Sequence, residues 1–207
     1  ASRRLNPGRM KRQILIHWAE IGLKGGNRPQ FIRRLVDRIR QGLESAQVAA
    51  KVTARRSRMV VTVEDGAQVE RAIRVLARIP GVANIAPVQT AETEIEAIKQ
   101  AAVAALEAAI PGTFKIESKR ADKSFPMTSI ELSQAVAGRC AAVTKRPADV
   151  HTPDVLVRVE LTKEKTFVSA GAVPGPGGLP VGSTTRLLSF LSGGLDSPVA
   201  TWQMVRR

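Results

Sequence analysis

The strongest candidate for chemistry is a glycine-rich loop, SGGLDS, at positions 192–197. It follows an apolar run that predicts a strand at 186–191, and it precedes a predicted helix at 198–207 that starts with proline. Adjacent glycines leave no side chain between the backbone and a ligand, and backbone N–H groups beside a helix N-terminus attract phosphate. The carboxylate of Asp196 suits Mg²⁺ better than it suits an anion. An ordinary glycine-rich turn is the alternative, but the whole pattern favours a nucleotide pyrophosphate site, although not a Walker A loop.

Two other loops carry positive charge that suits phosphate contacts. Their cations are Lys119, Arg120 and Lys123 in the loop 119–129, and Lys24 and Arg28 in the turn 22–28. A solvated loop is the alternative at the first place, and a plain strand–helix connection is the alternative at the second. We interpret both as candidate nucleic-acid contacts.

Other reactive side chains are scattered through the sequence. His17 and His151 have no neighbouring cysteine or carboxylate cluster, so a metal site of that kind is not expected. Cys140, the one cysteine, excludes an internal disulfide, fits a reducing cytosol, and falls in a helical apolar pattern typical of a buried thiol. No run reaches the ~20 apolar residues of a membrane span, and the first twelve residues lack the apolar stretch of a signal peptide. We therefore expect a cytoplasmic protein with no membrane contact.

The charge of the chain indicates an anionic partner. Its 207 residues include 32 Lys and Arg against 18 Asp and Glu, a formal net charge of +14. Residues 1–60 alone hold 15 basic and 3 acidic side chains. Aromatic residues make up 3%, with no tyrosine, which argues against recognition of single strands by base stacking. A solubilising basic surface is one interpretation, and nucleic-acid binding is the favoured one.

The first half of the chain has the order β-α-β-β-α-β. This order predicts an α+β fold of ferredoxin-like type, with helices on one face of an antiparallel sheet. The predicted elements are a strand at 11–20, a helix at 28–44, two strands within 47–65, a helix at 67–79 and a strand at 82–90. A second unit follows, with helices at 93–110 and 129–145, a strand at 113–121 and a hairpin at 155–171. Three prolines and four glycines within 172–183 predict a linker.

Six stretches along the chain resemble the tRNA uridine 4-sulfurtransferases, the ThiI family of tRNA 4-thiouridine synthetases that also serves thiamine biosynthesis. They are residues 19–31, 78–82, 119–132, 151–161, 175–183 and 187–202. The resemblance implies a ferredoxin-like domain, an α/β THUMP domain that binds tRNA, and the first strand, loop and helix of an α/β ATP-pyrophosphatase (PP-loop) domain. The expected bounds are a flexible leader at 1–10, the ferredoxin-like domain at 11–68 with its last helix and strand continuing to about 90, the THUMP domain at 69–172, a linker at 173–185 and the PP-loop start at 186–207.

The resemblance also assigns roles. It implies ATP and Mg²⁺ as cofactors, adenylation of uridine 8 in tRNA, and transfer of persulfide sulfur from a cysteine desulfurase. A sulfur carrier protein of thiamine synthesis and a homodimer are further expected partners. The tRNA contacts would include Lys119, Arg120 and Lys123, and Asp196 would meet Mg²⁺ through ATP. The implied ATP-binding residues are Phe190, Leu191, Ser192, Gly193, Gly194, Asp196 and Ser197.

The family's catalytic cysteine has no counterpart in this sequence, because Cys140 lies in the THUMP region. We therefore expect no catalytic residue among the 207 and no thiolation by this chain alone. The alternative is a non-catalytic THUMP module that only docks tRNA. A small-molecule sulfur- or amide-transfer enzyme is disfavoured, because a small substrate needs no extended basic surface.

Overall fold

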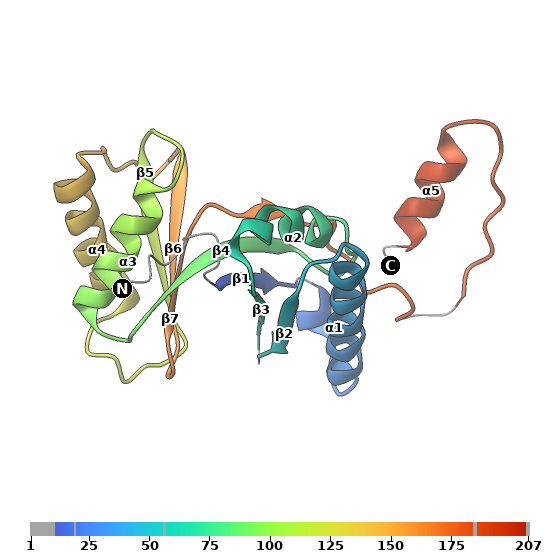
Figure 1. Cartoon of the computed structure of the whole chain (residues 1–207), viewed down its shortest axis with the longest axis horizontal. Helices are drawn as coiled ribbons and strands as arrows, with labels where there is room; N and C mark the ends of the chain where they lie inside the picture. The colour runs from blue at the N-terminus through green and yellow to red at the C-terminus, as the bar shows by residue number, and fades with distance from the viewer. Residues whose placement is uncertain (1–10, 19, 56, 184–185, 206–207) are drawn as a thin grey trace, which may run out of the picture. The chain divides into compact units, whose positions relative to one another are not determined.

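The computed structural model describes residues 11–18, 20–55, 57–183 and 186–205, and it divides into two compact units. Unit 1 comprises the chain up to Ile85 together with the part from Val173 onward, and unit 2 comprises Ala86–Ala172. The leader predicted at 1–10 lies outside the described residues. Figure 1 follows the chain through both units.

Unit 1 has the predicted β-α-β-β-α-β order. Its sheet order is β2-β3-β1-β4, and β3 is antiparallel to both β1 and β2. Val61 of β3 lies opposite Ile14 on one side and Val52 on the other, so the inward-facing residues stay in register. The elements are β1 (Arg12–His17), the 3-10 turn η2 (Glu20–Leu23), α1 (Arg28–Ser45), β2 (Ala50–Ala54), β3 (Met59–Val63), the 3-10 turn η3 (Gly66–Gln68), α2 (Val69–Leu76) and the start of β4 (Asn84–Ala91).

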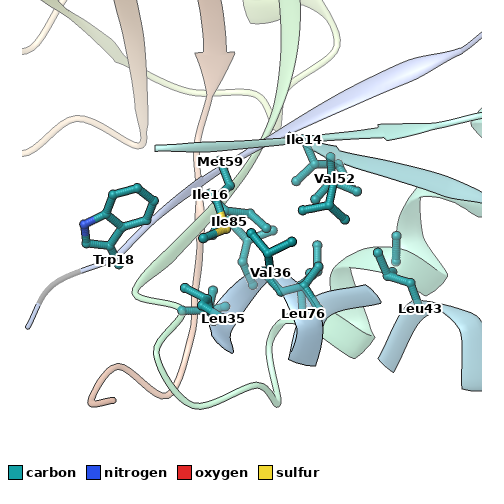
Figure 2. Close-up of a cluster of buried hydrophobic side chains, with 14 of the residues drawn as sticks. Ile14, Ile16, Trp18, Leu35, Val36, Leu43, Val52, Met59, Leu76 and Ile85 are labelled. Carbon is teal, nitrogen blue, oxygen red and sulfur yellow. The ribbon is translucent and has the colours of Figure 1, made fainter. Parts of the chain in front are cut away.

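The core of unit 1 lies between this sheet and the two helices. The four-residue spacing of Phe31, Leu35, Ile39 and Leu43 puts them on one face of α1, and all four are buried. Figure 2 shows the α1 side chains facing those of the strands, with Leu76 of α2 beside them. One apolar stripe on each helix therefore fixes which face of the sheet is covered.

The glycine- and proline-rich residues 173–183, which we call the return segment, pack on unit 1. The short strand β8 (Val173–Pro174) pairs with Asn84 and Ile85 of β4. Further on, Gly177 N donates to Val82 O over 2.8 Å, and Leu179 is 5% exposed within the core of unit 1. A Cβ at Gly175 would lie 2.4 Å from Val82 O, so only glycine lets the backbones approach this closely. Composition predicts a linker here, whereas the structure shows an ordered part of unit 1.

Unit 2 places two helices on one side of a mixed sheet (Figure 1). Its strand order is β4-β7-β6-β5, in which β5 and β6 are parallel and the other pairs antiparallel. Phe114, Leu132, Cys140 and Val157 are fully buried between the helices and the strands. The elements are α3 (Ile95–Glu107), β5 (Phe114–Arg120), α4 (Ser129–Thr144), β6 (Val155–Leu161) and β7 (Thr166–Ala170), joined by the end of β4.

The strand predicted at 186–191 is absent, which corrects that prediction. Leu188 and Phe190 are 80% and 84% exposed, and no strand is assigned over this stretch. A strand needs a neighbour for its backbone groups, and the described residues offer it none. The helix α5 (Asp196–Val205) does form. Within the described part of the chain, every helix is too short or too polar to cross a bilayer.

We predict that Leu179→Ala destabilises unit 1 by about 2–5 kcal/mol, because it leaves a cavity in a closed core. Urea unfolding followed by tryptophan fluorescence measures this, since Trp18 lies in the same core. The matched control is Val181→Ala, two residues further along and partly exposed, which should change stability by about 0.5 kcal/mol or less. A loss of about 0.5 kcal/mol or less in Leu179→Ala as well would show that Leu179 does not stabilise the core.

Candidate phosphate and nucleic-acid sites

The basic loop between β5 and α4 is held in one shape by Arg120. This arginine ends β5 and is half-buried. Its Nη1 donates to the carbonyl oxygen of Phe125 over 3.0 Å and to that of Met127. The guanidinium, which the sequence suggests for RNA, therefore binds its own loop. A direct RNA contact by Arg120 stays a prediction.

Hydrogen bonds further along order the rest of this loop. Asp122 Oδ1 accepts from Ser124 N (2.9 Å) and Ser124 Oγ (2.7 Å), which lowers the pKa of the Asp122 carboxyl. Thr128 caps α4: Glu131 N donates to Thr128 Oγ1, and Thr128 N donates to Glu131 Oε2 over 2.6 Å. These bonds from Thr128 lower the pKa of Glu131. The loop is thus preorganised before any ligand arrives.

Lys119 and Lys123 are the outward cations of this loop. Both residues are exposed, Lys119 at the end of β5 and Lys123 beyond the turn at Asp122. A fixed loop that presents two exposed ammonium groups can bind phosphate oxygens without losing further backbone entropy. The structure therefore separates the three predicted cations into one that shapes the loop and two that face solvent.

The turn 22–28 brings Lys24 and Arg28 onto aromatic rings. Lys24 Nζ lies 5.2 Å from the centroid of Phe31, and the guanidinium carbon of Arg28 lies 5.9 Å from that of Trp18. Both distances fall within the range of cation–π attraction. These cations therefore contribute to the edge of the unit 1 core, and their contact with RNA stays a prediction.

The loop 192–197 is closed by its two serines. Ser192 N donates to Ser197 Oγ over 2.8 Å, and the two hydroxyl oxygens lie 3.0 Å apart. A Cβ at Gly193 would have no atom within 4 Å, so the glycine side of the loop is open. The loop leads directly into the N-terminus of α5. Open backbone beside a helix N-terminus fits phosphate groups.

The residues predicted to contact the nucleotide and the metal ion are less enclosed than the phosphate loop. Phe190 and Leu191 are exposed, so they form no enclosed surface for a base here. Asp196 lies in the first turn of α5. The described ranges contain no group of three or more His, Cys, Asp or Glu side chains able to hold a metal ion. Mg²⁺ at Asp196 would therefore need phosphate oxygens as its other ligands.

Cys140 and the histidines do not form a reactive centre. Cys140 is fully buried in unit 2, and desolvation raises the pKa of its thiol to about 11. A protonated, covered thiol is a poor nucleophile. His151 N donates to Asp149 Oδ1 over 2.8 Å, which places this residue in a tight turn.

Arg146, which no pattern in the sequence singles out, holds the end of α3 to the segment before β5. Its guanidinium donates to the carbonyl oxygens of Leu106 (2.7 Å), Gly112 (2.8 Å) and Ile110. A cation at a helix C-terminus satisfies carbonyls that lack a partner within the helix. No local signal in the sequence shows it, because Arg146 lies 40 residues beyond Leu106.

We predict that Arg120→Gln loosens the loop 121–128. Loss of hydrogen bonds from a charged donor, about 1.5–3 kcal/mol each, should speed amide exchange in this loop roughly tenfold or more. Hydrogen–deuterium exchange with mass spectrometry measures the change. Lys123→Gln is the control, because it removes the same charge from the same loop without removing those bonds. Unchanged exchange in Arg120→Gln would show that other contacts hold the loop.

We predict that Cys140 in the folded chain reacts with a disulfide reagent at pH 8 only as fast as unit 2 opens, so labelling accelerates with urea. Because burial raises the pKa of the thiol to about 11, the thiol ionises in the unfolded chain before it ionises in the folded chain as pH rises above about 9. Native stability should then fall between pH 9 and 11 more steeply in the natural chain than in Cys140→Ala. Rapid labelling without urea would contradict the buried thiol.

Comparisons with known proteins agree with this geometry. Residues 13–86 match the family model of the ThiI ferredoxin-like domain, and residues 92–170 match that of the THUMP domain. A probable tRNA sulfurtransferase of Moorella thermoacetica is 39% identical over 96% of this chain and 50% of its own length. One from Caldanaerobacter subterraneus subsp. tengcongensis is 41% identical, over 96% and 51%. The chain spans about half the length of these curated relatives.

Solved structures give the same picture. The chain resembles a 4-thiouridine synthetase crystallised with RNA and bound ATP, at a TM-score of 0.75 and 28% identity, over 95% of this chain and 50% of the other. PH1313 from Pyrococcus horikoshii Ot3 shares the fold at a TM-score of 0.82 and 24% identity, over 95% and 65%. The chain therefore contains a ThiI ferredoxin-like domain followed by a THUMP domain, and it resembles the tRNA sulfurtransferases over about half of their length.

Proposed function

We propose that this chain binds tRNA and forms the recognition part of an ATP-dependent sulfurtransferase that makes 4-thiouridine. The observation that carries the proposal is the preorganised loop 120–128 of the THUMP domain. It presents two exposed cations, Lys119 just before the loop and Lys123 within it. The RNA bound to the related 4-thiouridine synthetase supports the same assignment. The low aromatic content favours recognition of folded tRNA through shape and phosphates.

The chemical step belongs to the same proposal. ATP would transfer AMP to the C4 oxygen of uridine 8 with release of pyrophosphate. The outer sulfur of a persulfide supplied by a cysteine desulfurase would then attack C4 and displace AMP, and a second thiol would cleave the remaining S–S bond, forming a disulfide with the carrier cysteine and leaving 4-thiouridine. From this chain, the open loop 192–197 would hold the pyrophosphate, and Asp196 would hold Mg²⁺ bound to it. Supply of sulfur for the thiamine thiazole is part of the same proposal.

A non-catalytic tRNA-docking module is the second candidate, because the exposed Lys119 and Lys123 would serve docking without any chemistry. The two candidates share RNA binding and differ in the chemistry. Binding of ATP with Mg²⁺ at the loop 192–197, measured by calorimetry, separates them, since the docking module has no use for ATP. Thiolation by this chain alone is expected from neither.

We predict that Lys119→Gln and Lys123→Gln each weaken tRNA binding at low salt. Each should also reduce the slope of log K against log salt by about 1, because one fewer phosphate contact releases fewer counterions. Fluorescence anisotropy with labelled tRNA over a salt series measures both quantities.

The control is Lys145→Asn, which removes one exposed charge at the far end of α4, about 24 Å from the loop. Asparagine tolerates the left-handed backbone of this residue, whose φ is 58°. It should leave the slope unchanged. An equal loss in all three variants, or salt-independent binding, would contradict recognition by the loop.

A further inference from the structure

An arginine-lined groove crosses unit 1 between α1 and α2. Two adjoining hollows form it, and both include Gly42, Arg78 and Ile79 in their walls. The larger encloses about 430 Å³. At one end the return segment contributes Val181, so the packing of that segment on the domain forms this end of the groove.

The floor of the groove is aliphatic. Val75 and Ile79 form it and are partly buried against the core of unit 1. Gly42 of α1 adds no side chain, and a Cβ there would lie 3.2 Å from both Val75 Cγ1 and Ile79 Cδ1. The missing side chain thus leaves apolar atoms at the bottom of the groove.

The walls carry four arginines and no acidic residue. Arg71, Arg74 and Arg78 follow one another at helical spacing along α2 and the turn after it, and Arg38 lies at the end closed by Val181. Arg38 Nε donates to Val181 O over 3.3 Å and Nη1 to Gln41 Oε1 over 3.1 Å, which orients this guanidinium. Arg74 pairs with Glu70 at 3.7 Å, and this ion pair is exposed and weak.

We propose that this groove docks an acidic, amphipathic segment of a partner protein, most simply a helix with aliphatic residues along one face. Arginine forks bind carboxylates bidentately, and arginine around an apolar centre is typical of protein interfaces. A partner helix lying along the groove would offer carboxylates at the spacing of the three α2 arginines. Its aliphatic side chains would cover Val75 and Ile79.

RNA satisfies fewer of these features. Phosphates would use the arginines, but a sugar–phosphate backbone has no apolar surface to cover the floor. Bases need aromatic rings or stacked guanidinium planes, and the floor consists of aliphatic atoms. The proposal goes beyond tRNA binding and does not depend on it.

The test is an NMR titration of the ¹⁵N-labelled chain with a short acetylated peptide that carries Leu at i, i+3, i+4 and i+7 flanked by Glu. We expect saturable shifts at Gly42, Val75 and Ile79 with about 1 mM peptide or less. Peptides in which Leu is replaced by Ser, or Glu by Gln, should bind with at least about tenfold lower affinity, as measured by the shifts of the same amides. Absence of saturable shifts, or equal binding of the Ser peptide, overturns the proposal.

Matched variants locate the site. Arg74→Glu with Arg78→Glu should weaken the peptide about tenfold or more, whereas Arg33→Glu with Arg34→Glu, the same charge change on exposed α1 positions outside the groove, should weaken it about threefold or less. If the double Glu variant of the groove fails to fold, the double variant Arg74→Gln with Arg78→Gln replaces it in the same measurement. Equal losses in groove and control pairs would show general charge attraction and overturn the proposal. The proposal is also overturned if tRNA shifts the amides of the groove and if the groove pair of substitutions lowers tRNA affinity more than the control pair does.

Discussion

The packing of the return segment against the turn after α2 is the interaction on which unit 1 depends. Backbone bonds between Gly177 and Val82 and between Gly81 and Gly177 (2.7 Å) hold the segment in place, and Leu179 fills the core. The ferredoxin-like domain is therefore completed by residues that follow the THUMP domain in the chain. Val181 then ends the arginine groove, so a surface feature depends on the same contact.

A net charge of +14 does not by itself define a binding surface, because the structure uses its cations in three ways. Arg120 and Arg146 donate to backbone carbonyls and hold a loop and a helix end. Lys24 and Arg28 lie over aromatic rings of the core. Lys119 and Lys123 face solvent instead. An ordered loop with few outward charges is a more specific phosphate site than a uniformly basic face, because its geometry limits which phosphates it meets.

The two proposed anionic partners differ in what lies beside the guanidinium or ammonium groups. The loop 120–128 offers charge on a polar, hydrogen-bonded frame, which suits the wet interface of a nucleic acid. The groove offers charge around aliphatic atoms, which suits a protein segment that buries apolar surface on binding. Under the two proposals, cationic side chains serve both sites, and the neighbouring atoms would select between the partners.

Local patterns in the sequence determined the helices, the β-α-β-β-α-β order and the resemblance to the ThiI family. Four-residue apolar spacing in α1 and alternation in the strands are properties of neighbours in the chain, and they suffice for such elements. The tertiary structure alone decided that the return segment is packed rather than free, that residues 186–191 form no strand, and that Arg120 turns toward Phe125 and Met127. Each of these depends on a partner distant in sequence or on the lack of one. Composition therefore could not reveal them, because burial and hydrogen bonding are settled only when the chain has folded.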